Sequence, residues 1–322
     1  MSLLAGCGSA SSASSASASA SSSSGYPVTV DTYSVSGDGA AWTPITATYD
    51  SEPQRVVANN QGTAQLLIRL GLADKLVGVA AVYGTAPDDV KEAFDKIPVI
   101  AQGYASKEAV QGVNPDFVTG RGDLFIDGDY GIGTVDELKD AGISSYITHV
   151  GYTGATFTSF LEDIDNYGKI FNVQDKAEDL KEYYQSYTDD LKKKYGDKDI
   201  KLAEVSYIND GSPVFGSAST ESLQNEALEM VGMHNINASA TGSEVSIETV
   251  IAENPQVIIL FDYAGGPDMD EMIQSLYDNP QLADIDAIRN HQVYSTDFSQ
   301  VYGGSGDLYS VVSDLAQKVY GE

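Results

Sequence analysis

The sequence is poor in cysteine and in positive charge, and both shortages limit what the protein can be. Its 322 residues include one cysteine, which excludes an internal disulfide and a cysteine-based metal site. Lysine and arginine total 18 against 47 aspartates and glutamates, so the net charge is −29. Nucleic acid and anionic lipid surfaces are poor partners for such a chain, and its self-repulsion favours a soluble monomer.

Long apolar runs and histidine are also scarce. No stretch of roughly 18 uninterrupted apolar residues occurs, so we expect no segment that spans a membrane. The three histidines, His149, His234 and His291, are far apart and lack the spacing of metal ligands. We therefore expect no metal site and no cofactor, although His149 follows a predicted strand and could contact a ligand or the iron of a haem.

The motifs of common enzyme classes are missing as well. The sequence has no phosphate-binding P-loop and no convincing G-x-G-x-x-G after a strand. Residues 303–307 approach the G-x-S-x-G nucleophile turn, but Asp307 stands where the last glycine should be. Ser305 and Asp307 are better interpreted as the start of the final helix. We expect no catalysis.

The first residues predict a lipid anchor. The run from Leu3 to Cys7, LLAGC, resembles the lipobox that ends a bacterial lipoprotein signal peptide, where the cysteine is lipidated. Residues 8–24 are almost entirely Ser and Ala, which is typical of a flexible tether. The charged start and long apolar core of a signal peptide are missing, so a chance run of small residues is the alternative. We expect lipidation of Cys7 and a location outside the cytoplasm, on the outer face of the cell membrane (the periplasm, if the organism has an outer membrane).

The rest of the chain alternates short apolar strands with amphipathic helices. Such alternation predicts an α/β fold with mostly parallel central sheets and right-handed crossovers. A hairpin over 28–49 is expected to come first, with Trp42 as a packing anchor rather than a ligand platform. Thr63 is expected to cap the first helix. The strands expected after the hairpin are 55–58, 76–80, 97–100, 117–119, 145–148, 201–208, 257–261 and 292–295.

One long helix is expected to join two lobes. Apolar residues recur at helical spacing over 174–195, and a helix of that length spans roughly 30 Å, the width of a small domain. On either side of it, SKEAVQGVNPDFV at 106–118 and SIETVIAENPQVI at 246–258 align without a gap. We expect a ligand cleft between the lobes. The predicted organisation is a tether over 1–24, an α/β lobe over 25–155, a bridging helix over 156–196 and a second α/β lobe over 197–322.

Five sequence motifs occur in the order found in a known family. They lie at 53–57, 66–79, 114–118, 138–143 and 288–294. Over roughly residues 50–322 the chain resembles the class III substrate-binding proteins of ABC importers, which capture ferric siderophores, haem or cobalamin. The resemblance implies two lobes joined by a rigid helix, ligand binding between them, small movements on closure, and no catalysis. The implied partners are an ABC permease with its ATPase and a metal chelate, in the first place a ferric siderophore, with haem or cobalamin as the alternative.

The resemblance also implies a pair of docking residues. In family members of known mechanism, one glutamate on each lobe enters an arginine pocket of the permease. By motif position these are Glu108 and Glu248, each two residues after the serine that begins one of the aligned helices. The alternative is local, because an acid in the first helical turn stabilises the helix dipole by about 0.3–1 kcal/mol. The dipole explains either glutamate alone, but not their equivalent places on two lobes.

Ligands of open α/β sheets bind beyond the carboxyl ends of the strands, which selects the candidate ligand-binding residues. Aromatic side chains dominate the set and suit a chelate with a flat or greasy periphery, although many of the 20 tyrosines will simply pack. Arg121, one of few arginines, could grip a negative charge or instead pair with a nearby acid, Asp123, Asp127 or Asp129. The predicted set is Asn60, Tyr83, Tyr104, Arg121, Tyr207, Tyr263, Phe298 and Tyr302.

A surface adhesin or interaction lipoprotein is the alternative of another class. The acidic composition and the tether would suit it equally well. A tight small-ligand site would argue against this alternative, and apolar surface patches without a cleft would argue for it.

Overall fold

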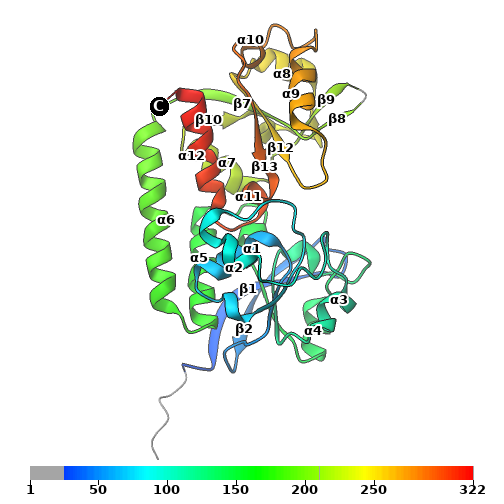
Figure 1. Ribbon diagram of the computed structural model, residues 1–322, viewed down its shortest axis with the longest axis vertical. Helices are drawn as coiled ribbons and strands as arrows, with labels where there is room; N and C mark the ends of the chain where they lie inside the picture. The colour runs from blue at the N-terminus through cyan, green and yellow to red at the C-terminus, as the bar shows by residue number, and fades with distance from the viewer. Residues whose placement is uncertain (1–24, 210, 322) are drawn as a thin grey trace, which may run out of the picture.

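The computed structural model describes residues 25–209 and 211–321, and there the chain forms two α/β lobes, one above the other in Figure 1. The predicted tether over 1–24 and the predicted lipidation site, Cys7, lie outside these residues. Within them, no helix has the length and apolar composition needed to cross a membrane. The expected α/β class, with two lobes and parallel sheets, is confirmed.

The N-terminal lobe is built on a parallel sheet with the strand order β4-β3-β5-β6. The apolar residues of these strands are buried between helices, as parallel sheets require. An antiparallel hairpin of β1 (Val28–Val35) and β2 (Trp42–Tyr49) lies beside β6, where Thr32 Oγ1 donates to the carbonyl of Ile147 at 2.9 Å. The other elements are β3 (Val56–Ala58), α1 (Gln61–Arg69), β4 (Leu76–Val79), α2 (Asp88–Phe94), α3 (Lys107–Gly112), β5 (Phe117–Gly120), α4 (Val135–Asp140) and β6 (Ser144–Ile147).

Two details of this lobe differ from the sequence prediction. The strand expected over 97–100 is only an isolated bridge between Val79 and Val99. Pro98 has no N–H to donate, so the ladder cannot continue through it. Helix α1 begins at Gln61 rather than after Thr63, with Asn60 as its N-cap residue.

The C-terminal lobe repeats the plan with the parallel strand order β10-β7-β12-β13. The strand predicted over 201–208 ends at Val205, and the chain turns into a small antiparallel sheet of β11, β9 and β8. The elements are β7 (Ile200–Val205), β8 (Tyr207–Asn209), β9 (Ser212–Gly216), α7 (Ser222–Glu229), β10 (Met233–Asn235), β11 (Glu244–Val245), α8 (Ile247–Glu253), β12 (Val257–Asp262), α9 (Met269–Tyr277), α10 (Asp286–Arg289), β13 (Val293–Asp297), α11 (Phe298–Tyr302) and α12 (Asp307–Tyr320).

The two aligned sequence segments adopt the same local structure. Ser106 and Ser246 are the N-caps of α3 and α8, and each hydroxyl accepts the N–H three residues later. Asn114 and Asn254 follow these helices with φ of 49° and 48°, a left-handed conformation that asparagine tolerates better than most residues. A proline and a central strand come next in both lobes. The sequence echo therefore marks one helix-turn-strand unit present in each half.

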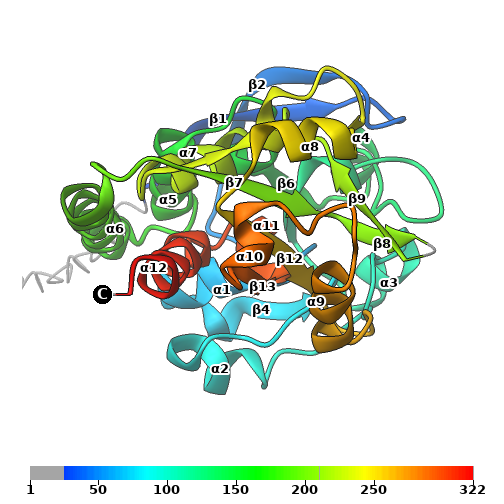
Figure 2. The ribbon, with the colours of Figure 1, turned by 90° about the horizontal axis from the view of Figure 1, so that it is seen from above.

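The connecting segment over 156–196 contains two helices rather than one. Helix α5 (Phe157–Ile170) packs against the N-terminal lobe, and α6 (Gln174–Tyr195) runs from that lobe to the other (Figure 1). The chain turns between them at Asn172, which has a φ of 53° and ends the first helix. Figure 2 shows α6 beside α12 at one edge of the molecule. Phe160, Tyr184 and Tyr309 join α5, α6 and α12 through ring contacts of 4.9 to 6.1 Å.

Candidate ligand-binding site

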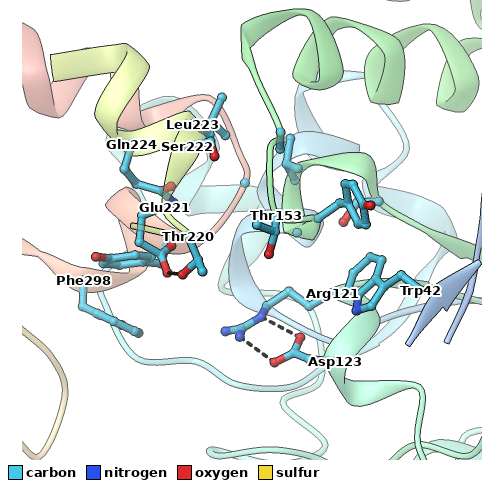
Figure 3. Close-up of a pocket in the computed structure, with 18 residues that line it drawn as sticks. Trp42, Arg121, Asp123, Thr153, Thr220, Glu221, Ser222, Leu223, Gln224 and Phe298 are labelled. Atoms are coloured by element: carbon cyan, nitrogen blue, oxygen red, sulfur yellow. Dashed lines mark hydrogen bonds and ion pairs between the residues drawn. The ribbon is translucent and has the colours of Figure 1, made fainter. Parts of the chain in front are cut away.

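A cavity with a volume of about 470 Å³ lies between the two lobes (Figure 3). Side pockets of about 300 Å³ and 20 Å³ share Phe298 and Tyr302 with it, and we call the three together the cleft. Loops that follow β3, β5 and β6 form one wall, and the start of α7 and the turn after β13 form the other. The cleft is therefore at the carboxyl ends of the strands, where open α/β sheets bind ligands.

Arg121 extends into the cleft from the loop after β5. Its Nε and Nη2 donate to the two carboxylate oxygens of Asp123 at 3.1 and 2.7 Å. Burial opposes the charge on Arg121, but the Asp123 carboxylate outweighs that effect and raises the pKa of the guanidinium. The Asn59 side chain fixes the loop by accepting from the Arg121 N–H at 2.8 Å and donating to its carbonyl at 2.9 Å. The ion pair considered from the sequence is thus present inside the predicted site.

Two acids stand on the opposite wall. Glu221, the N-cap residue of α7, faces Arg121 across the pocket in Figure 3. Glu204, on β7, lines the 300 Å³ side pocket and is only 6% exposed. Burial raises the pKa of Glu204 to about 7, and the nearby charge of Glu221 acts in the same direction. A carboxyl group in this position is close to half protonated at neutral pH.

The predicted aromatic residues form most of the side pocket. Phe298 is their centre: its ring lies 4.9 Å from Tyr302 and 6.4 Å from both Tyr83 and Tyr263. Tyr104 meets Tyr83 edge-on at 6.1 Å. Tyr104 and Tyr263 are more than a third exposed, so their faces are open to solvent in the cleft. These rings offer apolar surface with hydroxyl groups at its margin, which suits a large, partly polar ligand.

Asn60 and Tyr207 complete the predicted set, and only Asn60 reaches the cleft. Its Nδ2 donates to the carbonyl of Gly303 at 2.9 Å, which links the lobes, while its buried Oδ1 has no hydrogen-bond partner among the described residues. Tyr207 is 51% exposed and lines none of the three pockets. The chain leaves the central sheet after Val205, so Tyr207 is carried into the small antiparallel sheet instead of following a central strand end.

Sequence reasoning missed several residues of the cleft. Trp42 packs against Tyr33 and Tyr152 at 5.5 and 5.7 Å, as expected for an anchor, but it also lines the main pocket. Nothing local could show this, because it depends on how the hairpin lies beside β6. Glu204 did carry a signal: a single acid within the apolar run of a buried strand breaks the pattern and marks a special environment.

A buried polar network supports the wall from behind. Asp163 on α5 is fully buried and accepts from the Tyr146 hydroxyl at 2.6 Å, the His149 N–H at 2.8 Å and the Val150 N–H at 3.1 Å. It also lies 2.9 Å from His149 Nδ1. Burial lowers the pKa of His149, but the hydrogen bond and charge of Asp163 outweigh this and raise it. The network holds residues 149–151, of which Val150 and Gly151 line the cleft; His149 does not.

The predicted docking glutamates are exposed and sit in equivalent places. Glu108 lies in the first turn of α3 and Glu248 in the first turn of α8. Hydrogen bonds from its own N–H and from Ser106 lower the pKa of Glu108, so this carboxylate has local partners at the start of α3. Both helices lie away from α6 in Figures 1 and 2. In the part of the chain that the structure covers, no group of three or more His, Cys, Asp or Glu side chains could hold a metal ion.

Comparison with known proteins identifies the family. The family model described as "Periplasmic binding protein" matches residues 56–299, most of the chain. The chain belongs to the periplasmic binding protein family. This family comprises non-enzymatic transport components, so the expected absence of catalysis and the expected resemblance to substrate-binding proteins are both confirmed. The protein is a substrate-binding protein of this family, a non-enzymatic transport component.

Individual relatives of this periplasmic binding protein have low sequence identity but align over nearly the whole chain. An uncharacterised ABC transporter substrate-binding lipoprotein, YvrC, of Bacillus subtilis (strain 168) is 23% identical, with 99% of this chain and 93% of the relative aligned. The crystal structure of a periplasmic binding protein from Veillonella parvula has a TM-score of 0.80 at 25% identity, covering 92% of this chain and 99% of that one. The structure of an ABC-type Fe3+-hydroxamate transport system from Saccharomonospora viridis has a TM-score of 0.71 at 21% identity, with 92% and 100% covered.

Proposed function

We propose that the protein captures an iron chelate, in the first place a ferric siderophore, outside the cytoplasm and delivers it to an ABC permease and its ATPase. The observation that carries this proposal is the cleft of about 470 Å³ between the lobes, with an aromatic side pocket of about 300 Å³. That space is of the size of small-molecule sites in general and accommodates a chelate rather than a bare ion. The relative described as an Fe3+-hydroxamate transport system supports the same ligand class.

Haem and cobalamin remain the alternatives within this transporter type. Both hold their metal in a largely planar macrocycle whose faces or edges would suit aromatic walls. The site does not support the adhesin alternative, because an adhesin is expected to show apolar surface patches without a cleft, and this protein has a cleft with convergent polar groups. No specific observation favours a second class of function.

The sole tryptophan provides the test of ligand class. Trp42 lines the main pocket, so a bound ferric chelate should quench its fluorescence. Titration with ferric siderophores, haem and cobalamin should show saturable quenching by at least one of them at micromolar concentration. The Trp42→Phe variant controls for absorption of light by the chelate, because its remaining signal should not saturate. Absence of saturable quenching, with no binding heat by calorimetry, would reject the ligand class.

Docking through Glu108 and Glu248 is part of the same proposal. Replacing both by lysine should abolish uptake of the bound chelate in cells that carry only this variant, while affinity in solution is unchanged. The matched control reverses two exposed glutamates on other helices, Glu92 and Glu182, which changes the net charge equally. Normal uptake by the Glu108/Glu248 double variant would contradict the docking assignment without affecting the ligand assignment.

Anchoring through Cys7 is likewise proposed. The B. subtilis relative is described as a lipoprotein, which supports the interpretation of LLAGC as a lipobox. Cys7→Ser should move the protein from the membrane fraction to the soluble extracytoplasmic fraction when the chain is expressed behind a complete lipoprotein leader. Persistence of the Cys7→Ser protein in the membrane fraction would reject the anchor.

A further inference from the structure

The charged side chains of the cleft are unevenly divided between bases and acids. Among the described residues that line its three pockets, Arg121 is the one cation, whereas Asp123, Glu204 and Glu221 are acids. No lysine or histidine lines any of these pockets in the described chain. The cleft therefore carries a net negative charge even when Glu204 is protonated.

The guanidinium of Arg121 already forms an ion pair with Asp123. Its bidentate contact with Asp123, at 2.7 and 3.1 Å, is the geometry in which a guanidinium is best satisfied. An incoming carboxylate or catecholate could displace Asp123 only by leaving that acid unpaired beside the ligand. The exchange would replace one anion by another and add a repulsion.

The facing wall adds negative charge of its own. Glu221 lies across the pocket from Arg121 (Figure 3), and its Oε1 accepts from the Thr220 hydroxyl at 3.1 Å. Glu204 lies deeper, in the aromatic side pocket that Glu221 also lines. The chain as a whole carries a net charge of −29, so a negatively charged ligand is repelled on its approach as well.

We propose that the cleft selects an uncharged or cationic metal chelate and rejects a polyanionic one; this inference rests on the proposed function. An uncharged chelate, such as a ferric trihydroxamate, gains the contact with aromatic rings and needs no counter-charge. A cationic chelate is attracted in addition by Glu221 and by the faces of Tyr83, Tyr104 and Tyr263. A trianion, such as a ferric tris-catecholate, meets acids on both walls, and the one cation among the described residues of the cleft, Arg121, is already paired with Asp123.

The test is a competition panel read out by the fluorescence of Trp42 and by calorimetry. The probes are uncharged ferrichrome, cationic ferrioxamine B and aquocobalamin, and anionic haem and ferric enterobactin. The strongest ligand should be uncharged or cationic. If haem or ferric enterobactin binds most strongly, the inference is overturned and the proposed function stands. If no probe binds, the proposed function is overturned, and the inference falls with it.

A charge variant makes the test independent of ligand shape. Glu221→Gln should narrow the affinity gap between the strongest probe and ferric enterobactin by about three- to tenfold, as expected for removal of one nearby charge at the wall. The Glu221 side chain makes no capping hydrogen bond to α7, so the substitution should leave the helix intact. The control Glu182→Gln changes net charge equally on the exposed face of α6 and should leave the gap unchanged. An unchanged gap in Glu221→Gln would overturn the inference.

Discussion

The buried carboxyl of Glu204 makes the stability of the protein depend on pH in an unusual direction. Most carboxylates that gain partners on folding have lowered pKa values and stabilise the fold as pH rises. Burial raises the pKa of Glu204 instead, from an ordinary value near 4.5 to about 7. Below the ordinary value both the folded and the unfolded chain are protonated here. Between the two values only the unfolded chain loses its proton, so the free energy of unfolding falls as pH rises and levels off above the folded pKa.

The size of the effect follows from the shift. Each pKa unit corresponds to 1.36 kcal/mol, so the full contribution is about 3 kcal/mol, and roughly 2–3 kcal/mol of it should appear between pH 5 and pH 8. Glu204→Gln removes the ionisation and keeps the shape, and the Gln carbonyl can still accept the hydrogen bond from the Asn235 side chain. The free energy of unfolding of the variant, minus that of the original protein, should therefore be about 2–3 kcal/mol larger at pH 8 than at pH 5.

Urea unfolding followed by circular dichroism at the two pH values measures this difference directly. The variant is compared with the original protein at each pH. The effect of all other ionisable groups on stability then cancels, because both proteins share these groups. Glu182→Gln, on the exposed face of α6, serves as the matched control and should show no pH-dependent difference. A Glu204→Gln protein whose stability follows the original protein at both pH values would show that Glu204 is ionised in the folded state, and the assignment of a half-protonated cleft acid would be wrong.

Other substitutions probe the contacts that hold the lobes and the cleft wall. Gly62→Ala places a methyl group against the carbonyl of Gly303 in the C-terminal lobe and should lower the free energy of unfolding by about 1–3 kcal/mol. Gly112→Ala is the control: it has open space around it, so it should be neutral or stabilising by about 0.4–1 kcal/mol in urea unfolding. Asp163→Asn should cost about 3 kcal/mol, because the amide cannot satisfy all the buried donors, and a neutral result would refute the role of the network. Arg69→Met should destabilise by about 3–5 kcal/mol by leaving buried Asp307 unpaired, and adding Asp307→Asn should recover part of that loss.

The sequence predicted the fold better than it predicted the site, and particular residues show why. Strand β12 (Val257–Asp262) is a continuous apolar run, and Ser106 and Ser246 are N-caps, so local chemistry determines these elements. The break after Val205 is different, because it depends on pairing between β8 and β9, which no local pattern records. For that reason Tyr207 lies in the small antiparallel sheet and does not line the cleft.

The cleft illustrates the same limit. The rule that ligands bind at strand ends selected Arg121 and most of the aromatic residues that line the cleft, because it depends only on chain direction in parallel sheets. It could not find Trp42 or Glu221, since neither follows a central strand directly. The charge of the cleft comes from Arg121 and Asp123 on one lobe and Glu221 on the other. These residues share a cavity only once both lobes are in position.

The contacts between the lobes limit the movement that ligand binding can cause. Arg69 of α1 donates to Asp307 at 2.6 Å and to the carbonyl of Ser305 at 3.0 Å, and Tyr184 of α6 donates to the same carbonyl at 3.3 Å. Asp307 is buried, so a wide opening of the lobes would separate a buried ion pair at a cost of about 3–5 kcal/mol. A rotation that keeps this contact and changes the distance between Arg121 and Glu221 costs far less. We therefore propose that this buried ion pair, close to where the lobes meet, favours the small movement that the family resemblance implies.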